Sequence, residues 1–240
     1  MKILAQKRGS PQNMTQKPTI AFKTIFLCLS LLWFFAMTLT LGCSNFGSGN
    51  KKKEVVPKWT CDKAADEAMK RHDYEAGIAL HKRFLEKQPG NALALYHLGY
   101  GYGQLGDHQT EVSYYEKAMA LGLETDQISF NLGMAYGELD ETEKSINAFK
   151  KALEINPGSA EYHFELALAY LENTEKIEAK QELLKVIEID HGHVEARLIL
   201  SRLYVEQGEL QKATELIQEI LKMDPTNEKA RSLLHRVERN

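Results

Sequence analysis

Beyond residue 58, apolar side chains recur at the spacing of α-helices rather than of strands. Leu95, Leu98 and Tyr102 stand at i, i+3 and i+7, so they share one face of a helix. Pro157 and Pro225, each preceded by a short polar side chain, mark places where helices end and the chain turns. This pattern predicts an all-α fold of short helices joined by tight turns.

The helical pattern itself repeats every 34 residues. At each step a tyrosine returns, preceded by a leucine and a small residue. One helical hairpin cannot bury its apolar stripe alone, whereas stacked neighbours can, so the period predicts a linear array of hairpins. The recurring positions are Leu98-Gly99 with Tyr102, Leu132-Gly133 with Tyr136, Leu166-Ala167 with Tyr170, and Leu200-Ser201 with Tyr204.

These positions resemble the tetratricopeptide repeat, whose first helix carries Leu-small-x-x-Tyr and whose second carries Ala, an aromatic residue and Ala before a closing proline. The resemblance covers residues 58–240 and implies a right-handed α-solenoid of five helix-turn-helix units with a C-terminal capping helix. Two departures stand out: His81 occupies the aromatic position of the first unit, and Glu111 replaces alanine in the second. The units are 58–91, 92–125, 126–159, 160–193 and 194–227, followed by the capping helix at 228–240.

The apolar run 25–41 is of a different kind, because it has no polar face. As a helix it would span about 25 Å, between the length of a signal-peptide core and that of a full membrane span. Five basic residues and no acidic residue precede it, so this flank is expected to stay in the cytoplasm while the rest is exported. Met14 offers an alternative start that shortens the leader.

The leader covers residues 1–43, and the sequence LTLGCS at 39–44 resembles the lipobox of bacterial lipoprotein signals. Gly42 and Cys43 match that motif, while Thr40 stands where the family prefers leucine. The resemblance implies cleavage and lipidation at Cys43, and Ser44 after it implies sorting to the outer membrane. The alternative is an uncleaved signal anchor. Both tether the protein to a membrane by its N-terminus.

Charge and composition indicate a flexible segment and restrict the class of possible partners. Residues 44–57 are rich in Gly, Ser, Asn and Lys and are predicted to form a flexible tether. From residue 44 onward the chain holds 25 basic and 33 acidic residues, and this acidic body argues against nucleic acid as a partner.

From the second unit on, each first helix carries a second apolar stripe beside its packing face. In the resembled fold these positions line the concave groove, which predicts a binding surface for an apolar or amphipathic segment of another protein. The alternative is that these side chains simply pack between adjacent helices. We call them the groove set: Tyr96, Tyr100, Phe130, Met134, Phe164, Leu168 and Leu198. Beside it runs a predicted acidic rim that would select a basic or neutral amphipathic ligand: Glu138, Glu172 and Glu206.

The sequence contains no arrangement of residues that predicts a catalytic site. The Gly-rich run 99–103 lies inside a helical pattern rather than after a strand, which argues against a phosphate loop. His191 and His193 fall in a turn without a third ligand. His163 is expected on a helix surface, together with its neighbours Glu161 and Glu165. The sequence therefore predicts no enzyme, no cofactor and no metal site.

Together these features predict a membrane-tethered protein–protein interaction scaffold of the bacterial cell envelope, with its folded body facing the periplasm or the cell exterior. Its partner would be a segment of another envelope protein, in the assembly of a complex such as pili or a secretion machine. The alternative is a self-associating structural component, in which the groove set is buried against another copy.

Overall fold

The computed structural model describes residues 62–239, which hold eleven α-helices and no strand. The predicted leader with Cys43 and the predicted tether lie outside this range, as do residues 58–61 of the first predicted unit. None of the described helices combines the length and the apolar character that crossing a membrane requires. The helices are α2 (Lys63–Lys70), α3 (Tyr74–Lys87), α4 (Ala92–Gln104), α5 (His108–Ala120), α6 (Asp126–Glu138), α7 (Thr142–Ile155), α8 (Ala160–Glu172), α9 (Lys176–Ile189), α10 (Val194–Glu206), α11 (Leu210–Met223) and α12 (Glu228–Val237).

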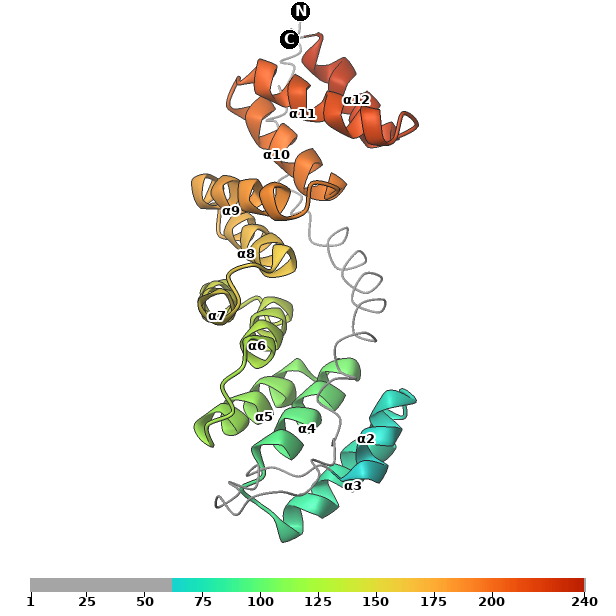
Figure 1. Cartoon of the computed structure of the whole chain (residues 1–240). Helices are drawn as coiled ribbons and strands as arrows, with labels where there is room; N and C mark the ends of the chain where they lie inside the picture. The colour runs from blue at the N-terminus through green and yellow to red at the C-terminus, as the bar shows by residue number, and fades with distance from the viewer. Residues whose placement is uncertain (1–61, 240) are drawn as a thin grey trace, which may run out of the picture. The chain divides into compact units, whose positions relative to one another are not determined.

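Consecutive helices form hairpins that stack in chain order, from α2 and α3 at one end to α12 at the other (Figure 1). The helices α4, α6, α8 and α10 begin 34 residues apart, in the register of the sequence repeat. Each hairpin packs mainly on the hairpins before and after it. The all-α solenoid of five hairpins and a capping helix, predicted from the sequence, is confirmed.

The same local chemistry starts each of these four helices. A side-chain acceptor one residue before the helix takes a hydrogen bond from the backbone N–H three residues later, which satisfies one of the free donors of the first turn. The four N-caps are Asn91, Thr125, Ser159 and His193. The histidine therefore has a structural task at the position where the other repeats use Asn, Thr or Ser.

The turn inside each hairpin also recurs, in a left-handed backbone conformation. Gly106 and Gly208 adopt φ values of +79° and +76°, which glycine tolerates without a steric penalty. Asp140 and Thr174 stand at the equivalent places with φ values of +58° and +63°. Thr174 is β-branched, so this turn is strained although its geometry matches that of its neighbours.

Close helix contacts explain the small residue of the repeat motif. A Cβ atom on Gly99 would lie 2.6 Å from the ring of Tyr115, and one on Gly133 would lie 2.5 Å from the ring of Phe149. No real side chain fits at these distances. The small residue of the first helix thus makes room for the aromatic residue of the second, as the family pattern implies.

The structure also accounts for the unusual Glu111. A Cβ atom on Gly103 would collide with the carboxyl group of Glu111, so the glycine provides the space that this side chain occupies. His108 Nδ1 lies 2.8 Å from Glu111 Oε2. Burial raises the pKa of Glu111, and the hydrogen bond to Glu111 raises the pKa of His108. A glycine and a histidine together accommodate the carboxyl group where the repeat normally has alanine.

Candidate functional site

The groove set divides into a buried and a partly exposed part. Phe130, Leu168 and Leu198 have exposed fractions of only 5%, 8% and 2%. The exposed stripe expected from the sequence therefore does not extend over all seven residues, and these three belong to the packed interior. The half-buried members are Tyr96, Tyr100, Met134 and Phe164.

Phe130 shows why the expectation of exposure was wrong for this part. Its ring stacks on Tyr162 of the next hairpin with the ring centroids 4.5 Å apart, and it lies 5.6 Å from the ring of Phe149. The aromatic residue from α8 covers the face of α6 that the helical period alone leaves open. Phe130 therefore packs between adjacent helices, which was the alternative considered for the stripe.

Two of the three tyrosines of α4, the groove-set members Tyr96 and Tyr100, carry uncharged hydroxyl groups. Asn131 donates hydrogen bonds to the hydroxyl groups of Tyr96 and Tyr115, at 3.3 Å each. Tyr100 packs edge-on against Tyr74 with the ring centroids 6.1 Å apart. Burial raises the pKa of Tyr96 to about 12 and raises that of Tyr100 as well. Both hydroxyl groups therefore stay neutral over the physiological pH range.

On α8, an acid that was expected at the surface is partly buried. One carboxyl oxygen of Glu165, Oε2, is buried and makes no hydrogen bond within the described residues. Burial, followed by the charges of Glu161 and Glu172, raises the pKa of Glu165 to about 8. Sequence reasoning missed this residue, although the spacing i, i+4, i+11 of the three acids on one helix face was the available signal.

The acidic rim is less uniform than its 34-residue spacing suggests. Glu138 is half-buried, whereas Glu172 and Glu206 are exposed. Glu206 Oε2 lies 2.6 Å from Lys176 Nζ, so its charge is paired across two repeats. Glu172 instead acts on the pKa of Glu165. The three acids of the rim therefore differ in burial and in the groups they act on.

Sequence models of the tetratricopeptide repeat match residues 63–122, 133–173, 160–192 and 177–237. The chain belongs to the tetratricopeptide repeat family. No curated protein sequence matches it.

Solved tetratricopeptide repeat structures share the fold of this chain. A crystal structure of MamA has 23% identity and a TM-score of 0.65, and the match covers 71% of this chain and 99% of that one. YrrB, described as having an unusual peptide-binding site, has 22% identity and a TM-score of 0.64 over 72% of this chain and 88% of its own. A tetratricopeptide repeat protein from Parabacteroides merdae has 22% identity and a TM-score of 0.63, over 73% and 70%. At these identities the likeness establishes the fold alone.

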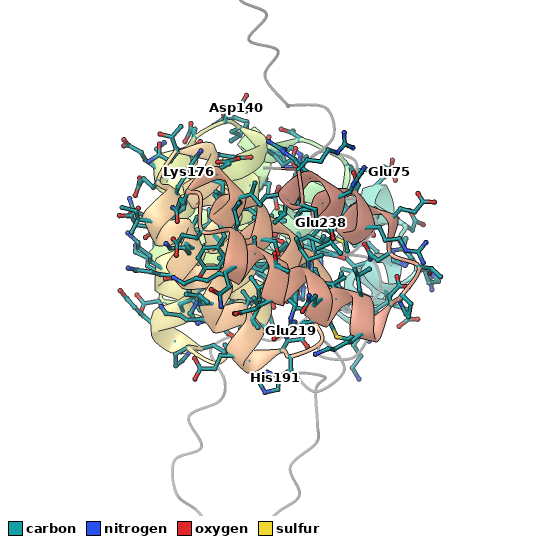
Figure 2. All side chains as sticks on the ribbon, turned by 90° about the horizontal axis from the view of Figure 1, so that it is seen from above. Glu75, Asp140, Lys176, His191, Glu219 and Glu238 are labelled. Atoms are coloured by element: carbon teal, nitrogen blue, oxygen red, sulfur yellow. The ribbon has the colours of Figure 1, made fainter. Side chains whose placement is uncertain are left out.

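Within the tetratricopeptide solenoid, the side chains of His191 and His193 contact backbone groups. His193 Nδ1 accepts a hydrogen bond from Ala196 N at 3.1 Å, and His191 Nδ1 lies 2.8 Å from the carbonyl oxygen of Ile187. Figure 2 shows His191 at the edge of the molecule, pointing away from it. The pair therefore shapes the turn between two repeats.

His163, expected at the surface, is buried, and that expectation was wrong. Its Nδ1 lies 2.6 Å from Glu182 Oε2 of the next helix, and its Nε2 lies 3.0 Å from the carbonyl oxygen of Pro157. Burial opposes the charge of Glu182, but hydrogen bonds from His163 and Lys185 outweigh it and lower the pKa of Glu182. The imidazole can be buried because α9 supplies a partner that the local sequence does not reveal.

A pocket of about 310 Å³ lies apart from the half-buried groove residues, between α5, α6 and α7. Three of its lining residues contact each other through polar or charged groups. Tyr136 donates a hydrogen bond of 2.7 Å to Glu116, and Lys144 lies over the ring of Tyr136 at 5.3 Å. These contacts strengthen the junction between repeats, and none of the half-buried members of the groove set lines this pocket.

Proposed function

We propose that this chain is a membrane-tethered scaffold of a bacterial cell envelope that binds a partner segment in its concave groove. The observation that carries the proposal is the series of half-buried Tyr96, Tyr100, Met134 and Phe164 on three successive first helices. Aromatic and methionine side chains suit adaptable contacts with apolar ligands. An apolar or amphipathic segment fits this surface better than a charged tail does.

The groove also favours a basic residue at one place in the ligand. Because the pKa of Glu165 is about 8, its carboxyl group is mostly protonated at pH 7. A lysine or arginine of the ligand placed beside Glu165 would stabilise its ionised form. The carboxyl group would then lose its proton and accept a charge-assisted hydrogen bond at a partly buried position. YrrB, a structural neighbour, is described as a peptide-binding protein of this family. The proposed ligand is thus an apolar segment that carries a basic side chain.

The tether is a separate part of the proposal and rests on the sequence. The apolar run 25–41, Cys43 and residues 44–57 support export, lipidation and a flexible link to the folded body. In this proposal the repeats face the periplasm or the cell exterior, and the outer membrane is the destination if Cys43 is lipidated. The scaffold would take part in assembling an envelope complex such as pili or a secretion machine, without catalysis of its own.

The proposal is tested by photo-crosslinking in cells with the reactive group at Phe164 of the full-length chain. The matched control carries the group at Ile177 on α9, whose exposed fraction is 63%. We expect an adduct with a second protein from Phe164 and not from Ile177. Mass spectrometry of the adduct then identifies the segment, which should be apolar with a lysine or arginine. Absence of any adduct from Phe164 would contradict groove binding.

Self-association is the alternative, and exposed apolar side chains on the second helices favour it. They project from α7, α9 and α11 rather than from the groove. An adduct of the chain with itself, together with a dimer in light scattering that Ile177→Glu abolishes and Phe164→Glu does not, would favour this alternative. The most exposed of these side chains are Ile155, Ile177, Leu184 and Met223.

A further inference from the structure

Three side chains of metal-ligand type converge at the junction of the first two repeats. Asp66 comes from α2, His81 from α3 and His97 from α4. Asp66 Oδ1 lies 2.9 Å from His97 Nδ1 and 3.5 Å from His81 Nε2. One ligand atom of each residue lies within 4.8 Å of the other two, and in the described part of the chain this is the one group of three with that property.

His81 is the unusual member of this cluster. It stands 34 residues before Tyr115, at the core position where the next two repeats place aromatic rings. Its side chain has an exposed fraction of 0%. Neither of its ring nitrogens makes a hydrogen bond within the described residues. A phenylalanine would fill this position without leaving a polar atom unsatisfied, so the imidazole requires a further explanation.

Two imidazole nitrogens and a carboxylate oxygen form a common ligand set for zinc and related divalent ions. With metal–ligand bonds of about 2.0–2.2 Å, ligand atoms around one ion stand about 3–3.5 Å apart. The separations of 2.9 Å and 3.5 Å from Asp66 Oδ1 to the two histidine nitrogens fall in or close to this range. Asp66 and His97 have exposed side-chain fractions of 21% and 23%, which leaves a path from solvent.

We propose that Asp66, His81 and His97 bind one divalent transition-metal ion, with Zn²⁺ as the first choice. Each residue supplies one ligand atom, and solvent completes the coordination. The protonation state of the buried ring agrees with this role: burial and then His97 lower the pKa of His81 to about 4, so its nitrogen lone pair is available at neutral pH.

The ion would have a structural consequence at this end of the solenoid. Among the described residues, the first repeat contacts a neighbouring repeat on one side only. Its first helix, α2, has 8 residues, whereas α4, the first helix of the second repeat, has 13. Terminal repeats lack the packing that stabilises internal ones. An ion held by α2, α3 and α4 joins the terminal hairpin to the second repeat.

The test is a titration of the purified full-length chain, without a histidine tag, with Zn²⁺ in competition with a chromophoric chelator. We expect one tight equivalent per chain and a rise in unfolding temperature on Zn²⁺ addition. His81→Phe and His97→Ala should each weaken binding by at least about 100-fold, more than the 10–100-fold typical of losing an outer-shell partner. His191→Ala, which removes an exposed histidine from a distant turn, should leave binding unchanged.

The design separates loss of a ligand from loss of the fold. His81→Phe places in the core the type of residue that the next repeats use, and His97→Ala changes a partly exposed side chain. Circular dichroism without metal should show native helix content for both. The proposal is overturned if the wild-type chain binds no single equivalent, if both variants bind as tightly as the wild type, or if only His191→Ala abolishes binding.

Discussion

Two buried histidines, one in the first repeat and one in the fourth, have opposite surroundings. His163 in α8 has both ring nitrogens close to oxygen atoms, at 2.6 Å from Glu182 and 3.0 Å from Pro157. His81 in α3 is fully buried, yet neither of its nitrogens makes a hydrogen bond within the described residues. The same side chain thus has close oxygen partners in the fourth repeat and, among the described residues, no hydrogen bond in the first.

Burial alone therefore does not distinguish a structural polar residue from a binding residue. His163 is held by groups from its own chain, so it stabilises the contact between α8 and α9. His81 and the buried oxygen of Glu165 lack hydrogen bonds in the described structure, and each lies where a ligand is proposed. These two groups differ from His163 in lacking a hydrogen bond to the described residues, and this difference supports the proposed sites.

The largest expected effect comes from making the same substitution at both histidines. His163→Phe leaves the carboxyl group of Glu182 without its buried partner and should lower the free energy of unfolding by about 3 kcal/mol. With a metal chelator present, His81→Phe should change that free energy by less than about 1 kcal/mol, since it removes unsatisfied polar atoms. Urea unfolding of both variants measures the two losses in free energy of unfolding, and equal losses would contradict the contrast between the two histidines.

A second, intermediate effect should appear at Glu165 as a dependence on pH. The unfolded carboxyl group ionises near its ordinary pKa of 4.5, whereas the folded one ionises near 8. Folding therefore takes up a proton between these values, and stability contributed by this group is lost as the pH rises through that window. Glu165→Gln lacks the loss and should be more stable than the wild type at pH 8 by about 2 kcal/mol.

Urea unfolding at about pH 5 and pH 8 measures this effect. Glu154→Gln, at an exposed position on α7, serves as the matched control and should leave the pH dependence as in the wild type. If Glu165→Gln also kept the wild-type pH dependence, Glu165 would not be an unsatisfied acid.

The smallest effect is expected from Lys185, whose Nζ donates a hydrogen bond of 3.0 Å to Glu182, the acid that also contacts His163. Its side chain is half exposed, so Lys185→Met should cost only about 0.5 kcal/mol at neutral pH. The lowered pKa of Glu182 gives stability that is present above pH 4.5 and lost on acidification. The variant should therefore lose less stability in acid, and acid unfolding followed by circular dichroism tests this.

The sequence was sufficient to predict the architecture but not the partners of polar groups. The spacing of Leu98, Gly99 and Tyr102 identifies a helix face and its 34-residue repetition, because both depend only on positions along one helix. The burial of Phe130 depends instead on Tyr162 of the next hairpin. The placement of His163 likewise depends on Glu182, 19 residues further on. Contacts across helices are set by packing, which the period does not encode.

The proposed metal cluster shows the same limit more strongly. Asp66, His81 and His97 come from three helices, and no short motif brings them together in the sequence. The sequence did show that His81 departs from the aromatic pattern of its position. A departure of this kind, at a core position, is the signal that would direct attention to such a site.

The central claim is that one continuous segment of a partner occupies the groove. It is tested most directly by crosslinking from one end of the groove set while a residue at its other end is substituted. The photo-reactive group is placed at Tyr100 on α4, in the wild-type background and in Phe164→Glu on α8. Circular dichroism confirms that the variant is folded. The account predicts that the adduct formed from Tyr100 is lost in the variant, although the two positions lie two repeats apart. An undiminished adduct would contradict a continuous binding groove.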